Sequence, residues 1–180
     1  MLQITIPPVE GWDERTETFV NLKGATLQLE HSLVSLSKWE SKWRKPFISK
    51  ENKSHEETID YIKCMTITQN VKPDVYARLT NQHLQEINDY IGAEMTATTF
   101  SEEKNGKRNN EKITAEIIYH WMIALQLPME CQKWHLNRLI ALIRVCSIKN
   151  APPKKMSKRD IMSQNAALNE ARKKALNTRG

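Results

Sequence analysis

The sequence predicts a mainly α fold, with a helical, bundle-like body, a small N-terminal antiparallel β element and a C-terminal basic helical arm. Apolar residues recur at three- and four-residue spacing from residue 32 to 150, which is typical of packed helices. Strand-like alternation occurs in residues 1–31, and residues 93–100 are expected to form a short strand or an extended segment. Residues 151–180 hold eight basic and two acidic side chains, which accounts for the whole net charge of +6. We therefore expect a single globular domain over residues 1–150 and an arm over 151–180.

The β element is expected in the first 31 residues. Residues 2–6 alternate as Leu-Gln-Ile-Thr-Ile, and Pro7-Pro8 should end that strand. Residues 16–21 and 25–30 are expected to form two more strands. Lys23-Gly24 between them is a plausible turn, because glycine adopts positive φ without strain. So small a sheet is not stable alone and must pack on helices or on another chain.

Capping residues mark the starts of the helices over residues 32–150. Ser32, Ser54 and Thr80 each precede an apolar-periodic segment, and Ser54 has a glutamate three positions later, as in a capping box. Pro73 suits the first turn of a short helix. Residues 101–112 are polar with glycine and asparagine near their centre, and we expect a mobile loop there.

The most apolar stretch covers residues 114–127, and a second helical run is expected over 129–148 after Pro128. The two should form an antiparallel helical hairpin at the centre of the core. The expected core residues are Leu33, Leu36, Trp39, Trp43, Ile62, Ile87, Ile118, Trp121, Met122, Trp134, Leu139 and Ile143.

The weak candidates for chemistry are Cys131 and His135, four residues apart on an expected helix face, with His120 as a third member. A zinc site needs at least three protein ligands, and the second half of such a set is missing. The same residues could act as nucleophile and base, but nothing else supports that reading. The sequence carries no glycine-rich phosphate loop and no paired CxxC. We expect no metal, no cofactor and no enzymatic activity.

The arm is the main candidate binding site. Its basic residues are Lys154, Lys155, Lys158, Arg159, Arg172, Lys173, Lys174 and Arg179. They could bind a protein partner or neutralise phosphates, although the arm has no aromatic residues on which bases could stack. Nucleic acid is therefore expected only through this arm. The plainer interpretation is a solvated helical tail. No apolar run is long enough to cross a bilayer, and no membrane partner is expected.

Several stretches together resemble a known family. They are residues 27–43, residues 61–66, Cys-Gln-Lys-Trp-His-Leu-Asn-Arg at 131–138, Pro-Pro-Lys-Lys-Met-Ser-Lys-Arg at 152–159, and residues 165–180. The chain resembles tailed-bacteriophage tail-region proteins, of the tail assembly chaperone kind found in phages of Gram-positive hosts. The similarity spans most of the chain, but no motif in it is a signature of chemical activity.

The resemblance implies a non-enzymatic role in virion assembly. Such chaperones coat the long, helical, aggregation-prone tape measure protein in the host cytoplasm before the tail tube polymerises. Family binding residues cannot be carried over, because there is no residue motif to match. Two alternatives stay open: a virion structural component, such as a connector or tube-associated subunit, and a small regulatory or anti-defence protein that binds a host factor. A homo-oligomer is compatible with each.

Overall fold

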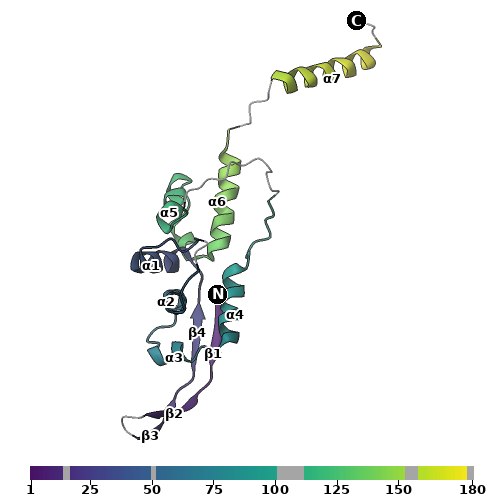
Figure 1. The fold of residues 1–180 in the computed structure, drawn as a ribbon. Coiled ribbons are helices and arrows are strands. Elements are labelled where there is room, and N and C mark those ends of the chain that lie inside the picture. Colours follow the sequence, from purple (N-terminus) through teal and green to yellow (C-terminus); the bar gives the residue numbers. More distant parts are fainter. Residues whose placement is uncertain (14–16, 50–51, 101–111, 153–157, 178–180) are drawn as a thin grey trace. The chain divides into compact units, whose positions relative to one another are not determined.

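The computed structural model describes residues 1–13, 17–49, 52–100, 112–152 and 158–177 and has a mainly α fold with a small N-terminal β element (Figure 1). The chain divides into two units, Met1–Ser147 and Ile148–Gly180. The helices of the first unit begin with α1 (Leu33–Trp43), α2 (His55–Met65), α3 (Pro73–Ala77) and α4 (Asn81–Gly92). They continue with α5 (Ala115–Ala124), the 3₁₀ helix η1 (Met129–Lys133) and α6 (Leu136–Asn150), which extends into the second unit. The helix α7 (Lys158–Leu176) lies in the second unit.

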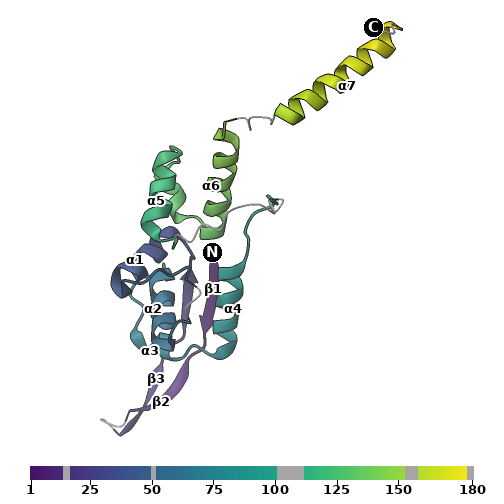
Figure 2. The ribbon, with the colours of Figure 1, turned by 45° about the horizontal axis from the view of Figure 1, so that its top comes forward.

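The strands form one long antiparallel ribbon in two halves. Strand β1 (Leu2–Ile6) pairs with β4 (Ala25–Leu29), and β2 (Val9–Asp13) pairs with β3 (Thr18–Leu22). The predicted turn at Lys23-Gly24 is therefore wrong, because β3 and β4 pair with different strands. Pro7-Pro8, which has no N–H donors, interrupts the ladder without ending the ribbon, and β2 beyond it was not predicted. Both views show β2 and β3 at the end of the ribbon farther from α1 and α5 (Figures 1 and 2).

Gly24 allows the two strands to approach closely at the interruption of the ribbon. It does not have the positive φ that a turn would require. A Cβ atom at this position would lie 2.9 Å from the carbonyl oxygen of Ile6 and 3.1 Å from the ring of Pro8. A backbone oxygen at that distance cannot move aside as a flexible side chain can.

We expect Gly24→Ala to lower the free energy of unfolding by about 1–3 kcal/mol, because the added methyl group overpacks against backbone. Urea unfolding followed by circular dichroism measures the change. Gly92→Ala is the matched control, since a Cβ there meets nothing within 4 Å. Equal effects of the two substitutions would contradict this interpretation of Gly24.

The predicted helix starts are confirmed by their hydrogen bonds. Ser32 Oγ accepts from the backbone N–H of Ser35, and Ser54 Oγ accepts from that of Glu57 at 3.2 Å. Thr80 Oγ1 accepts from the N–H of His83 at 3.3 Å. In each helix the side chain at the third position returns a bond to the capping residue's N–H, so two otherwise unpaired donors are satisfied.

The first core packs one face of β1 and β4 against α1, α2, α3 and α4. Alternate residues of the two strands point into it, whereas Gln3, Thr5, Thr26 and Gln28 on the other face are exposed. The buried members of this core are Ile4, Ile6, Leu27, Leu29, Trp39, Tyr61, Ile62, Met65, Val75, Tyr76, Ile87 and Tyr90. Its apolar strand residues were not among those predicted for the core.

The second core lies between α1, α5, η1 and α6. Its buried members are Leu33, Leu36, Ala115, Ile118, Met122, Cys131, Leu136, Leu139 and Ile143. Helices α5 and α6 belong to this core and not to the first, so they are not the centre of the whole fold. Helix α1 contributes to both cores, through Leu33 and Leu36 on one side and Trp39 on the other.

Three tryptophans predicted for the core are only partly buried: Trp43, Trp121 and Trp134. The indole Nε1 of Trp43 donates to Asp60 at 2.9 Å, and the guanidinium of Arg138 lies 4.4 Å from the ring centroid of Trp134. A polar N–H on an apolar ring favours such boundary positions. The other nine predicted core residues are buried.

The predicted continuous helix over residues 129–148 is also wrong. Helix η1 ends at Lys133, and Trp134 is extended. His135 forms a β-bridge with Ser32, and the N–H of Leu136 donates to the carbonyl of His31 at 2.7 Å before α6 begins. Pairing with the segment that precedes α1 thus replaces the helical hydrogen bonds that this stretch could have made.

Candidate protein-binding surfaces

Helix α7 carries five of the eight predicted arm residues: Lys158, Arg159, Arg172, Lys173 and Lys174. Every side chain of α7 that the structure describes is exposed. Lys154, Lys155 and Arg179 lie outside the described residues. Most of the stability of helices in proteins comes from packing of an apolar face, so a helix this exposed is expected to gain stability from a partner.

Three of the apolar residues of α7 form a stripe. Ile161, Leu168 and Ala175 recur every seven residues and therefore lie on one side of the helix. Lys158 and Arg172 occupy an adjacent row, because each lies three residues before a member of the apolar row. The result is a narrow apolar surface flanked by positive charge, which suits a partner with apolar and acidic groups.

A second exposed apolar surface lies on β2 and β3. Trp12 and Phe19 are directly opposed in the register, and their ring centroids are 4.9 Å apart in an edge-to-face arrangement. Their exposed fractions are 54% and 75%. Glu10 and Asn21, also cross-strand partners, lie on the same face of the ribbon. This aromatic pair was not predicted, because the expected strands did not include β2.

Arg78 connects this half of the ribbon to the helical body. Its guanidinium donates to the carbonyl of Pro7 at 3.1 Å and to that of Lys23 at 3.0 Å, and it forms an ion pair with Asp74 at 3.3 Å. Both interruptions of the ribbon are therefore held by one side chain that follows α3. The side chain of Arg78 is mostly buried, which strengthens these charge-assisted bonds.

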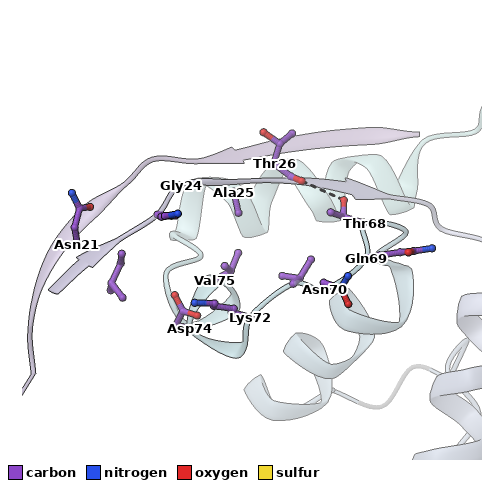
Figure 3. Close-up of a pocket in the computed structure, with 13 residues that line it drawn as sticks. Asn21, Gly24, Ala25, Thr26, Thr68, Gln69, Asn70, Lys72, Asp74 and Val75 are labelled. Carbon is purple, nitrogen blue, oxygen red and sulfur yellow. Dashed lines mark hydrogen bonds between the residues drawn. The ribbon is translucent and has the colours of Figure 1, made fainter. Parts of the chain in front are cut away.

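A pocket of about 440 Å³ lies beside the same interruption, between the β3–β4 junction and residues 68–75 (Figure 3). Thr68 Oγ1 donates to the carbonyl of Thr26 at 3.3 Å and closes one side. The lining includes Lys72 and Asp74, which have opposite charges, and contains none of the candidate site residues predicted from the sequence.

The structure places Cys131 and His135 in different local elements. Both are buried, but they are separated by the break between η1 and α6 and do not share a helix face. His120 is exposed on α5. Among the residues that the structure describes, no group of three or more His, Cys, Asp or Glu side chains could hold a metal ion.

His135 belongs instead to a buried polar cluster with His31. The two imidazole centroids lie 5.1 Å apart. His135 Nε2 lies 3.0 Å from the carbonyl oxygen of Tyr90 and must donate to it, which leaves Nδ1 without a partner. His31 Nδ1 lies 2.5 Å from the hydroxyl of Tyr61. Burial raises the pKa of Tyr61, so the phenol keeps its proton in this contact.

Both histidines are therefore neutral. Burial, assisted by the neighbouring His135, lowers the pKa of His31 from 6.5 to about 3, and burial also lowers the pKa of His135. A second proton on His135 Nδ1 would have no acceptor. The cluster joins the α1, α2, α4 and α6 regions of the body and has the character of a structural network.

Comparison with known proteins identifies no relative of this chain. No protein-family model matches the chain, and searches of curated proteins and of solved structures also give no match. In the described part of the chain, no helix is long and apolar enough to span a membrane.

Proposed function

We propose that the protein is a non-enzymatic tail assembly chaperone of a tailed phage, which binds the tape measure protein in the host cytoplasm. The observation that carries the proposal is α7, a helix whose described side chains are all exposed and which combines an apolar stripe with basic residues. A helix of this kind is suited to pack along another helix. The resemblance of the sequence to tail assembly chaperones supplies the identity of the partner.

The contact would use both features of α7. The row of Ile161, Leu168 and Ala175 would cover apolar side chains of the tape measure helix, and the flanking cations would pair with acidic residues beside them. Such coverage keeps an aggregation-prone helix in solution until the tube encloses it. Ordering of α7 on the partner would also offset the low stability of the free helix.

Co-expression with a tape measure fragment tests the proposal. We expect the full chain to keep the fragment in the soluble fraction and a chain truncated after Ala151 to lose that effect. Leu168→Glu should also lose it, because a charge then interrupts the apolar stripe. Ser163→Glu, which adds the same charge on the far side of the helix, should retain it. A fragment that stays insoluble with the full chain would refute the proposal.

The open edges of β2 and β3 and the exposed Trp12–Phe19 pair favour one alternative, a virion structural component whose ribbon adds to a neighbouring subunit's sheet. In that case the protein would be located in the virion. Mass spectrometry of purified particles separates the two functions, because a structural subunit is present at stoichiometric amounts and a chaperone is not.

A further inference from the structure

We propose that the face of β2 and β3 carrying Trp12 and Phe19 binds helix α7 of a second copy of this chain. The inference goes beyond the proposed function, because it concerns contact between copies and does not depend on which partner α7 binds during assembly. It rests on two surfaces within the described residues, each exposed in the single chain and each complementary to the other.

The apolar parts of the two surfaces correspond. Trp12 and Phe19 present adjoining rings on one face of a ribbon that projects past the helices, and α7 presents the row of Ile161, Leu168 and Ala175. Aromatic rings with large exposed area are frequent anchors of protein interfaces. A helix lying across the ribbon would remove the rings and the aliphatic side chains from water together.

The charges also correspond. Residues 9–22 contain four acidic side chains and one arginine, whereas α7 contains five basic and two acidic side chains. Glu10, on the ring-bearing face, and Glu17, the residue before β3, are both exposed. Lys158 and Arg172 flank the apolar row on α7. Two hairpins placed face to face would instead bring like charges together, so the arm is the favoured occupant.

We assign the arm to a second copy, because a chain that bound its own arm would stay monomeric in the experiment below. The aromatic pair and the described side chains of α7 are exposed, each within its own unit of the chain. A contact between two different surfaces repeats from copy to copy and generates rings or open chains. The apolar row of α7 can contact one partner at a time. Self-association would therefore keep this row bound to the hairpin of a second copy until a helical partner displaces that copy.

Sedimentation velocity of the full-length protein over a concentration series tests the proposal. We expect the mean mass to rise with concentration from that of a monomer to beyond that of a dimer. Phe19→Ser, Glu10→Arg and Arg172→Glu should each weaken association by about tenfold or more. Arg159→Glu is the matched control, because it changes the net charge equally but lies on the other side of α7 from Arg172. A wild-type protein that stays monomeric, or an Arg159→Glu effect equal to that of Arg172→Glu, would overturn the proposal.

Mixing the variants establishes that the contact is between molecules. An equimolar mixture of Glu10→Arg and Arg172→Glu chains should regain association, because the reversed hairpin of one meets the reversed arm of the other. A mixture that associates no more strongly than either variant alone would mean that Glu10 and Arg172 do not meet between copies, and would overturn the proposal. Neither measurement involves a tape measure fragment. Phe19→Ser should still solubilise such a fragment, so failure of the proposed function is distinguishable from failure of self-association.

Discussion

Glu40→Ala should lower the free energy of unfolding by about 3–5 kcal/mol, because it leaves two backbone N–H groups without acceptors. The carboxylate of Glu40 accepts from the N–H of Phe47 and from the N–H of Ala115, each at 2.7 Å. Ala115 is the first residue of α5 and is fully buried, so water cannot replace the lost bond. One side chain thus joins α1 to the segment after it and to a helix start 75 residues away.

Urea unfolding measures this effect, and Glu40→Gln separates its causes. Burial raises the pKa of Glu40, while the two backbone donors act in the opposite direction. Glutamine retains one acceptor oxygen, so we expect it to lose less stability than alanine. Glu116→Ala, an exposed change in the first turn of α5, is the control and should cost little. A loss below about 1 kcal/mol for Glu40→Ala would contradict the role assigned to the carboxylate.

Acidification from pH 7 to pH 5 should destabilise the protein by about 2 kcal/mol through His31 alone. The pKa of His31 falls from 6.5 in an unfolded chain to about 3 in the folded protein, so the unfolded state binds the proton first. The stabilising contribution is therefore complete above pH 6.5 and is lost as the pH falls from there toward 3. His135 adds to the loss, because burial lowers its pKa as well.

Other groups near these helices determine how the experiment must be controlled. Burial raises the pKa of Glu40, so protonation of Glu40 offsets part of the loss of stability on acidification. The pKa values of Glu57 and Asp60 are lowered, so protonation of these two carboxylates adds to the loss of stability, but only at more acidic pH. His31→Gln keeps a hydrogen-bonding group for the Tyr61 hydroxyl but does not titrate, so its unfolding free energy should vary less between pH 7 and 5. His120→Gln, at an exposed site, should behave like the wild type. Equal pH dependence of His31→Gln and wild type would rule out the buried histidine as the cause.

The sequence predicted the elements whose signals are local. Ser32, Ser54 and Thr80 act as caps through bonds that span three residues, so the residue pattern was sufficient to locate them. The strand pairing of the ribbon, in contrast, is not determined by a local signal. A strand ladder depends on which distant segment is opposed, and Lys23-Gly24 has the composition of a turn although β3 and β4 continue in one direction through it.

The break before α6 and the candidate surfaces have similar explanations. Residues 134 and 135 are compatible with a helix, and only their pairing with the segment at Ser32 makes them extended. The basic residues of the arm were evident from composition. The aromatic pair was not, because Trp12 and Phe19 become neighbours only through the register of β2 and β3.

The contacts of Arg78 have a mechanical consequence. Its two carbonyl acceptors, on Pro7 and Lys23, lie where the ladder of the ribbon is interrupted, so a force on the tip of the hairpin would reach the helices through this guanidinium as well as along the backbone. Loss of that group would leave the outer strands joined to the inner ones by two short peptide segments that could act as hinges. The angle at which Trp12 and Phe19 face an incoming molecule thus depends in part on a side chain outside the ribbon.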